Sequence, residues 1–377
     1  DIMGKYSLID LFAGCGGLSL GMEQAGFEPV FVNEINATFC ETYINNHRLS
    51  RDRYYIGDIN QLNAEIEKYL PLFKDVDIVC GGPPCQGFSM ANRQRIIDDP
   101  RNTLYKAYLQ FLQYVKPKFF LMENVRGMAQ KIDEIIDDLH VYLGKEYTFA
   151  YSLLNAKDFG VPQNRIRFII IGNRIGVDVK QIFNDIKSDT MPVFTLGDAI
   201  CDLPKLKPNR IKNNNSIENE DCGFERTEYE YLRTDFYNFI NNGRKISVLY
   251  NHKNRYNNDR DIKIFGTLPQ GANSLHPSIA DIMPYKNRNH IFKDKYFKLN
   301  ENEICKTITS HMKFDCNMYI HPREARGLTP REAARIQTFP DDYVFTGPQN
   351  SWYAQIGNAV PVKLAAVIGK HIIKHLK

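Results

Sequence analysis

The chain has 377 residues, of which 43% are hydrophobic and 24% charged, and its formal net charge at pH 7 is +4. This composition is typical of a globular protein with room for two domains, and no run reaches the roughly 20 apolar residues of a membrane span. The first residues show no succession of basic and apolar groups, so we expect no signal peptide. The mild charge permits nucleic-acid binding, but only the distribution of charge can argue for it.

The first 175 residues alternate short apolar runs with helical patterns. We expect strands at residues 7–12, 29–33, 54–56, 76–80, 119–122, 147–154 and 167–172, and helices at 18–25, 37–46 and 104–115. Alternation of this kind predicts an α/β fold with a doubly wound, parallel sheet.

The pattern changes after residue 173. From about residue 191 to 322 the chain is rich in Asn, Tyr and Lys without regular alternation, which predicts a second, smaller and irregular domain of short strands and long loops. Helices return at residues 329–338, where Thr329 and Glu332 suit a capping box, and at 362–376. We therefore expect domains at 1–180 and 181–340, with 341–377 returning to the first domain.

Five of the expected strands are followed by residues that suit a binding site. They lead to a glycine-rich loop, Glu34, Asp58, a turn that carries Cys85, and Glu123, in chain order. Open α/β sheets bind ligands outside the carboxyl ends of their strands, so these groups converge on one predicted site.

The glycine-rich string GCGG at residues 14–17 lets the backbone approach a ligand closely. It has neither the full G-x-G-x-x-G spacing nor a P-loop lysine, so phosphate binding is not supported. Glu34 suits ribose hydroxyls and Asp58 an adenine amino group, although a solvated Glu34 and a helix-capping Asp58 are the simpler interpretations of each alone. Together they predict an adenosine-containing cofactor without a diphosphate. Phe12 either lies near a cationic sulfonium or belongs to the core.

Eight cysteines are scattered along the chain without a C-x-x-C pair or a zinc-site spacing, so we expect reduced thiols and no metal site. Most should be small buried hydrophobes. Cys85 differs because it follows two prolines and lies among Gly81, Gly82 and Gly87. A stiff turn at a strand end presents a thiolate outward, where it can act as a nucleophile.

Six strings, in order, carry a resemblance: DLFAGCGGLS (10–19), GPPCQGFS (82–89), ENV (123–125), QNRIR (163–167), LTPREAAR (328–335) and QIGNAVP (355–361). They resemble the ordered motifs of the DNA cytosine-C5 methyltransferase family, of the bacterial restriction-modification type. The resemblance implies a Rossmann-like fold with a mixed sheet and a target-recognition region between residues 167 and 328. It also implies S-adenosyl-L-methionine as methyl donor, S-adenosyl-L-homocysteine as product and double-stranded DNA as substrate.

The resemblance also implies roles for four catalytic residues. Cys85 would add to C6 of a cytosine that has flipped out of the duplex. Glu123, protonated or sharing a proton, would hydrogen-bond cytosine N3. Arg167 would contact cytosine O2, and Arg165 would hold the base or a nearby phosphate and tune the thiolate.

The residues expected at the cofactor share the strand ends and the final motif. They are Phe12, Gly14, Gly16, Gly17, Leu18, Glu34, Ile35, Asp58, Ile59, Pro83, Leu104, Asn358 and Val360. Ile35 departs from the family, since some members carry an aromatic residue there that stacks on adenine; an isoleucine still supplies an apolar face.

Residues 86–102 resemble the family's mobile loop, which closes over the flipped base. Two basic clusters interleaved with tyrosines, at 244–260 and 286–298, suit phosphate and base-edge contacts, with a solvated face as the alternative. The residues expected to contact DNA are Gln86, Ser89, Arg93, Arg244, Lys253, Arg255, Thr307 and Arg323. Arg326 is a further candidate for a phosphate contact, and Lys298 belongs to the second basic cluster.

Three other functions stay open from the sequence: methylation of transfer RNA, a nicotinamide-dependent oxidoreductase, and a non-catalytic DNA-binding relative. The basic middle region favours duplex DNA, and Cys85, Glu123 and the paired arginines favour catalysis over the other two. We expect a monomer in the bacterial cytoplasm, associated with the nucleoid and not with a membrane. Its expected partner is a cognate restriction endonuclease, without obligatory contact.

Overall fold

A computed structural model describes residues 6–84, 97–98, 102–212, 217–284 and 293–376. By its internal contacts, the chain divides into two units. The first unit comprises Asp1–Phe159, Ile166–Met191 and Val360–Lys377, and the second comprises Gly160–Arg165 and Pro192–Ala359. The sequence predicted functional domains at 1–180, 181–340 and 341–377. The two units are defined by contacts alone, so these functional domains stay a prediction.

The first unit is built on a sheet, in which the described residues form seven strands in the order β3-β2-β1-β4-β5-β7-β6. The strands are β1 (Tyr6–Leu11), β2 (Phe27–Glu34), β3 (Tyr54–Ile56), β4 (Ile78–Gly81), β5 (Phe119–Val125), β6 (Thr148–Asn155) and β7 (Ile166–Asn173). Strands β1 to β5 pair in parallel, while β7 runs antiparallel to both of its neighbours.

The mixed sheet confirms the predicted Rossmann-like fold class and corrects the expectation that all strands are parallel. Strands β6 and β7 are joined by residues 156–165, which hold only the short 3-10 helix Ala156–Phe159. A parallel return needs a crossover of a dozen or more residues, so this connection brings β7 back antiparallel.

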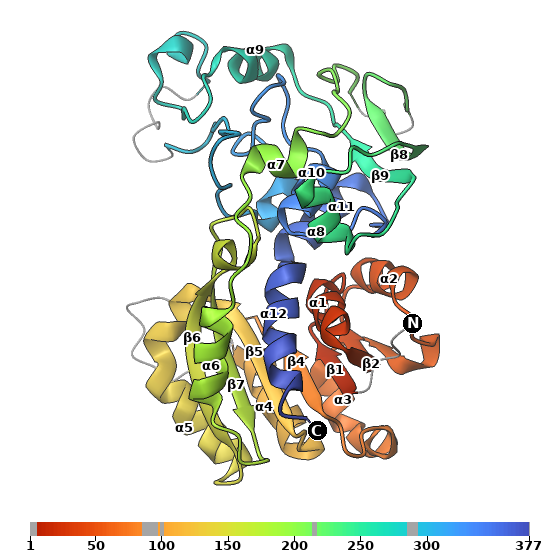
Figure 1. The fold of residues 1–377 in the computed structure, drawn as a ribbon, viewed down its shortest axis with the longest axis vertical. Coiled ribbons are helices and arrows are strands. Elements are labelled where there is room, and N and C mark those ends of the chain that lie inside the picture. Colours follow the sequence, from red (N-terminus) through yellow and green to blue (C-terminus); the bar gives the residue numbers. More distant parts are fainter. Residues whose placement is uncertain (1–5, 85–96, 99–101, 213–216, 285–292, 377) are drawn as a thin grey trace. The chain divides into compact units, whose positions relative to one another are not determined.

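Helices cover both faces of the sheet (Figure 1). One packed set is α1 (Gly17–Ala25), α12 (Val362–Ile373) and α6 (Val179–Ser188), and the other is α3 (Ile59–Ala64), α4 (Thr103–Val115) and α5 (Ile132–Leu143). Helix α2 (Ala37–Asn46) packs beside β2. The close approach of α1 and α12 requires Gly21, where a Cβ atom would lie 2.3 Å from the carbonyl oxygen of Val362. The last helix is therefore an integral part of the first unit.

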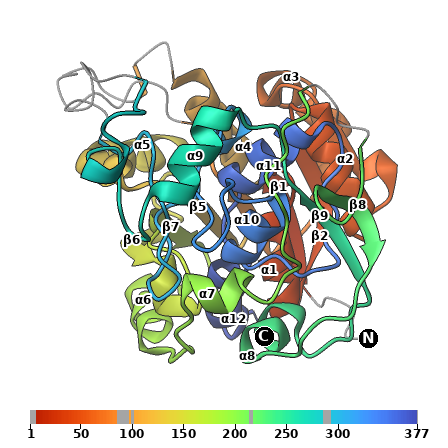
Figure 2. The ribbon, with the colours of Figure 1, turned by 90° about the horizontal axis from the view of Figure 1, so that it is seen from above.

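The second unit has fewer regular elements. Its helices are α7 (Leu196–Ile200), α8 (Asp235–Asn241), α9 (Asp259–Thr267), α10 (Pro330–Ile336) and α11 (Gln349–Asn358), and its hairpin pairs β8 (Gly223–Glu228) with β9 (Val248–Lys253). Helix α10 packs against α7, α11 and β9 (Figure 2). It begins with the expected capping box, because Thr329 and Glu332 exchange backbone-to-side-chain hydrogen bonds of 2.8 and 3.2 Å.

Among the described residues, one apolar helical stretch, Gln349–Ile373, has the length of a membrane span. It comprises α11 and α12, which are separated by a break at residues 359–361. Its most apolar window is 72% buried inside the protein. Burial of this extent is typical of core helices.

Candidate active site at the carboxyl edge of the sheet

The structure brings the predicted strand-end residues to one edge, because β3, β2, β1, β4 and β5 are adjacent and parallel. Glu34 is the last residue of β2, while Asp58 and Pro83 follow β3 and β4. Glu123 differs from the expectation, since it lies inside β5 rather than after it. Four predicted residues (Cys85, Gln86, Ser89 and Arg93) lie outside the described residues.

The glycine-rich loop after β1 is held by the carboxylate of Glu34. Gly14 and Gly16 have φ values of 57° and 98°, a left-handed conformation that glycine adopts without steric cost. Glu34 Oε2 accepts a 2.7 Å hydrogen bond from the Gly14 amide, and its Oε1 accepts one of 2.8 Å from the Asn36 amide. Burial raises the pKa of Glu34, while these amide donors lower it. Glu34 therefore braces the glycine-rich loop through its carboxylate.

The neighbouring side chains fit the adenosine part of the predicted cofactor. Ile35 is 67% exposed and directly follows Glu34, which places an apolar surface beside a carboxylate. Asp58 caps α3 by accepting hydrogen bonds from the backbone and side chain of Asn60 at Oδ1, as its simpler interpretation predicted. The same carboxylate keeps Oδ2 for an amino group. A Cβ atom on Gly14 would meet no atom within 4 Å, so the loop borders open space.

The other expected cofactor residues differ in their burial. Leu18 and Ile59 are buried, and Phe12 and Leu104 are half-buried against the main hydrophobic core. Phe12 also has a positive φ of 55°, which marks the sharp turn out of β1. Val360 begins the last segment of the first unit, whereas Asn358 is an exposed residue at the end of α11 in the second unit.

Glu123 and Arg167 form an ion pair across β5 and β7. Arg167 Nε lies 2.9 Å from Glu123 Oε1, and the two side chains are 14% and 15% exposed. Burial lowers the pKa of Arg167, and the charge of Glu123 opposes that shift. Gly82 lies against the same carboxyl group, since a Cβ atom there would be 3.1 Å from Glu123 Oε2. The pair is thus a fixed carboxyl–guanidinium unit in a close-packed part of the sheet edge.

Asn124 links this pair to the turn that precedes Cys85. Its side-chain nitrogen donates a 2.8 Å hydrogen bond to the carbonyl oxygen of Pro83. The ends of β4 and β5 are therefore tied together next to Glu123. Asn124 lies within the string ENV, but no local signal in the sequence marks it for this role.

The described cysteines contrast with the expected role of Cys85. Cys15, Cys40, Cys80, Cys222, Cys305 and Cys316 are buried, and Cys201 is half-buried. Burial raises the pKa of Cys15 to about 12, so this thiol in the glycine-rich loop stays protonated at neutral pH. Such thiols are inert, as expected for small buried hydrophobes.

Comparison with known proteins identifies the family of this chain. A model of C-5 cytosine-specific DNA methylases matches residues 6–374. The chain belongs to the C-5 cytosine-specific DNA methylase family. This confirms the resemblance seen in the sequence and excludes the nicotinamide-dependent oxidoreductase.

Individual relatives of this DNA methylase agree with that assignment. The type II methyltransferase M1.HphI of Haemophilus parahaemolyticus is 33% identical over 98% of this chain and 87% of its own length. The type II methyltransferase M.DdeI of Desulfomicrobium norvegicum is also 33% identical, over 97% of this chain and 88% of its own. A putative DNA modification methyltransferase encoded within an E. coli prophage has a similar structure, with a TM-score of 0.76, 26% identity and 99% coverage of both chains.

Arg165 has a structural environment that the sequence did not predict. The methylase buries this side chain to 2% exposure within the second unit. The guanidinium donates hydrogen bonds to the carbonyl oxygens of Ile308 (2.5 Å), Ala359 (3.0 Å) and Gly357 (3.2 Å). Arg165 thus fixes the backbone next to Thr307, and its expected contact with the base or a phosphate stays a prediction.

Two buried glutamines, which carry no local signal in the sequence, also hold the backbone next to Thr307. The Gln163 side-chain nitrogen donates to Gln337 Oε1 at 2.6 Å, and Gln163 Oε1 accepts from the Ile308 amide at 2.8 Å. Thr307 in turn donates from Oγ1 to the carbonyl oxygen of Asn164 at 2.7 Å. The predicted DNA-contacting Thr307 is therefore held against the segment that leads into β7.

Four other residues predicted to contact DNA already form ion pairs or hydrogen bonds with residues of the second unit. Arg244 makes a two-pronged ion pair with Asp342 at 2.6 and 2.9 Å, and Arg323 makes one with Glu301 at 2.6 and 2.9 Å. The Lys253 side chain is 6% exposed and lies 3.5 Å from Glu218. The Arg255 guanidinium donates to the carbonyl oxygens of Met312 and Lys313. Contact of these groups with DNA stays a prediction, and it requires exchange of these partners for phosphate.

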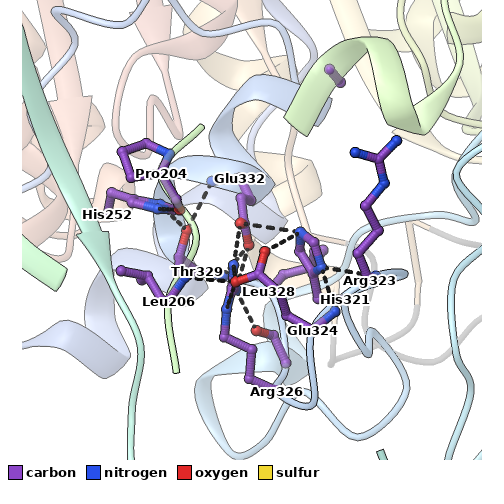
Figure 3. A network of polar contacts seen from close by, with 12 residues as sticks. Pro204, Leu206, His252, His321, Arg323, Glu324, Arg326, Leu328, Thr329 and Glu332 are labelled. Carbon is purple, nitrogen blue, oxygen red and sulfur yellow. Dashed lines mark hydrogen bonds and ion pairs between the residues drawn. The ribbon is translucent and has the colours of Figure 1, made fainter. Parts of the chain in front are cut away.

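Arg326 and Lys298 are both buried, and their contact with phosphate stays a prediction. Arg326 is 1% exposed and donates to both carboxylate oxygens of Glu332, at 2.9 and 2.7 Å (Figure 3). Lys298 is 8% exposed and donates to the carbonyl oxygen of Phe265 at 2.8 Å. A sequence shows that a residue is basic, but not that its charge is neutralised inside the fold.

Proposed function

We propose that this methylase transfers a methyl group from S-adenosyl-L-methionine to C5 of a flipped-out cytosine within a specific sequence of duplex DNA. The observation that carries the proposal is the Glu123–Arg167 pair, held at the sheet edge where Glu34 and the glycine-rich loop also lie. We assign the nucleophile to Cys85, which comes two residues after Pro83 in the sequence; Asn124 holds Pro83 beside this pair.

The cofactor residues suit an adenosine-bearing ligand without a diphosphate. Glu34 would accept from the ribose hydroxyls, Asp58 from the adenine amino group, and Ile35 would cover one face of the ring. When bound, S-adenosyl-L-methionine supplies an electrophilic methyl group on a sulfonium. The absence of a phosphate-binding spacing in the loop agrees with a cofactor that carries no diphosphate.

The residues of the chain prepare the cytosine for attack. The Cys85 thiolate adds to C6, and the electron pair of the C5–C6 double bond shifts toward N3, where Glu123 donates a hydrogen bond or a proton. C5 then becomes the nucleophile for methyl transfer. Loss of the C5 proton restores the double bond and expels Cys85 as the thiolate. Arg167 stays charged throughout, so it can hold Glu123 while it meets cytosine O2.

The biological setting follows from the relatives. Several are type II methyltransferases by name, which supports the modification enzyme of a restriction system. We propose a monomer in the bacterial cytoplasm that meets its DNA at the nucleoid. It would share the target sequence with a cognate endonuclease without obligatory contact between them.

Trapping on fluorinated DNA tests the chemistry. The protein is incubated with S-adenosyl-L-methionine and duplex DNA in which 5-fluorocytosine replaces cytosine, since fluorine blocks the final elimination. We expect a protein–DNA adduct that survives denaturing electrophoresis. Cys85→Ala should abolish it and retain cofactor binding, while the matched variant Cys201→Ala should form it. Glu123→Gln should slow adduct formation by about 100-fold or more.

Two outcomes would overturn the proposal. Adduct formation by Cys85→Ala would remove the assigned nucleophile. Equal methylation of transfer RNA and duplex DNA by the wild-type protein would remove the assigned substrate. If the wild-type protein is active, sequencing of the methylated sites then identifies the DNA sequence that it recognises.

A further inference from the structure

An exposed aromatic side chain follows the Thr307 segment in the second unit. Phe314 is 69% exposed and comes directly after the short 3-10 helix Ser310–Lys313. One exposed apolar residue is ordinary on a protein surface and needs no explanation by itself. The surroundings of Phe314 are what distinguish it.

Arg255 and helix α11 hold the turn that carries Phe314. Arg255 donates hydrogen bonds to the carbonyl oxygens of Met312 and Lys313 and to Cys316 Sγ, and its guanidinium lies 4.3 Å from the ring centre of Tyr353. On the other side, a Cβ atom on Gly357 would lie 2.3 Å from the Ser310 amide nitrogen, so α11 packs directly on this backbone. The turn therefore cannot fold inward to bury the Phe314 ring.

The charges around the ring suit a polyanion. Lys313 Nζ lies 4.8 Å from the ring centre of Phe314, and the exposed His311 ring lies 5.5 Å from it. The neighbouring acidic residue, Asp315, is half-buried and accepts a 3.0 Å hydrogen bond from the Asn317 amide. An exposed ring beside a lysine ammonium and a histidine side chain matches a nucleic acid, which offers flat base faces between phosphates.

The segment also adjoins the part of the chain that enters the active site. Thr307 donates to the carbonyl oxygen of Asn164, three residues before Arg167. In an intact duplex, neighbouring bases cover each base face, so a side-chain ring can stack only where a base step is opened. Flipping of the target cytosine opens such a step.

We propose that Phe314 inserts its ring against a base at the step that flipping opens, while Lys313 and His311 face the adjacent phosphates. Phe314 is then a DNA-contacting residue that stabilises the flipped complex. This inference rests on the proposed function, because it requires a duplex from which one base is extruded.

The test compares Phe314→Ala with Leu232→Ala, a matched change at another apolar side chain of the second unit, which is 66% exposed. The probe is the duplex whose methylated site has been identified with the wild-type protein. We expect Phe314→Ala to raise the Kd and KM for this duplex by about 10-fold. Cofactor affinity and Tm should match the wild type, and Leu232→Ala should match it in every measurement.

Fluorescence supplies an independent reading. The natural chain has a single tryptophan, Trp352, which is 3% exposed. Phe314→Trp therefore adds an exposed tryptophan, whose fluorescence can be distinguished from that of the buried Trp352. We expect this variant to bind the duplex tightly and its new emission to be quenched on binding, as base stacking quenches indole.

The outcomes separate this inference from the proposed function. If the wild-type protein methylates no DNA, the proposed function fails. If the wild type is active but Phe314→Ala binds the duplex within twofold of it, the inference alone is overturned. Unchanged emission of Phe314→Trp on binding would likewise overturn it.

Discussion

The first unit buries one large apolar core between regular elements, whereas the second unit combines smaller apolar clusters with charged side chains buried among loops. In the first, side chains such as Val79, Phe120 and Leu112 fill the space between the sheet and its helices. In the second, Arg326, Arg331 and Arg335 surround or belong to α10, and they are the largest fully buried side chains in the described part of the chain. The two units thus obtain their interiors in different ways.

The difference follows from the backbone. A parallel sheet pairs its own N–H and C=O groups, so its interior can be apolar. Loops leave carbonyl oxygens unpaired, and a buried guanidinium offers five donors to satisfy them. Arg331 illustrates this, since it donates to the carbonyl oxygens of Tyr250, Pro340 and Tyr343. Stability in the second unit should therefore depend on single charged side chains.

Removal of Arg335 should have the largest effect. Its guanidinium donates to both oxygens of Asp341, at 2.8 and 2.9 Å, and to Asp202 at 2.7 Å. Arg335→Met would leave Asp341 buried without its counter-charge, so we expect a loss of about 3–5 kcal/mol in the free energy of unfolding. Urea denaturation measures the loss, and hydrogen exchange should locate it in the second unit.

The control for that variant lies in the first unit. Arg51 pairs with Glu41 at 2.6 Å, but the two side chains are 68% and 41% exposed. Arg51→Met should leave the unfolding curve unchanged, because solvent screens such pairs. A loss from Arg335→Met no larger than that of Arg51→Met would show that buried charge does not hold the second unit together.

A buried chain of hydrogen bonds that runs from Tyr43 through Ser19 to Asp10 gives the next prediction. Asp10 accepts a 2.6 Å hydrogen bond from Ser19, whose oxygen accepts one of 2.6 Å from Tyr43. Burial raises the pKa of Asp10 to about 7. The folded state therefore favours the protonated carboxyl, and this residue costs stability as the pH rises from about 4 to 7. Between pH 4.5 and pH 8, Asp10→Asn should therefore gain stability relative to the wild type, by up to about 3 kcal/mol.

Denaturation curves between pH 4.5 and 8 check this. A constant difference between Asp10→Asn and the wild type across that range would show that Asp10 does not titrate in the folded state.

His252 should give the opposite dependence on pH in the second unit. It is 2% exposed, faces the Thr329 hydroxyl at 3.0 Å through Nδ1 and the Pro204 carbonyl oxygen at 2.8 Å through Nε2 (Figure 3). Burial lowers its pKa to about 4, with Glu332 opposing and Arg326 adding to the shift. The stability that neutral His252 contributes is complete above pH 6.5 and is lost as the pH falls through 4.

His252→Gln removes this titration and keeps a donor for the Pro204 carbonyl. As the pH falls from 7 to 4, the variant should therefore lose less stability than the wild type, by up to about 3 kcal/mol. His140→Gln, at an exposed position of the first unit, is the control substitution. Parallel profiles of His252→Gln and wild type would contradict the prediction.

The same contrast explains what could be predicted from the sequence. Strands β1 to β5 were recognisable because apolar runs and punctuating glycines are local signals, and their order placed Glu34, Asp58 and Glu123 at one edge. Helix α5 was missed although Ile132, Ile135 and Leu139 have helical spacing. The direction of β7 was missed because it depends on the length of a connection rather than on any motif.

In the second unit, the missing information was in contacts distant along the chain. Gln163 and Gln337 bond to each other across 174 positions, and neither carries a local signal. Arg326 looks like any surface arginine until Glu332 is found against it. Where a fold depends on pairs of buried polar groups, the sequence shows which polar residues are present but not which of them pair with each other.

Removal of helix caps should give the smallest loss in the free energy of unfolding, and the loss should be similar in the two units. Thr195 caps α7 in the second unit through a reciprocal box with Asp198, with hydrogen bonds of 2.8 and 3.2 Å. Asp178 caps α6 in the first unit by accepting a 3.0 Å hydrogen bond from the Lys180 amide. A cap acts on the first turn of its own helix, so Thr195→Ala and Asp178→Ala should each cost about 1 kcal/mol in urea denaturation. A much larger loss for Thr195→Ala would mean that the five-residue helix α7 unfolds with its cap and that α10 loses a packing partner. Short helices, and not only buried charge, would then set the stability of the second unit.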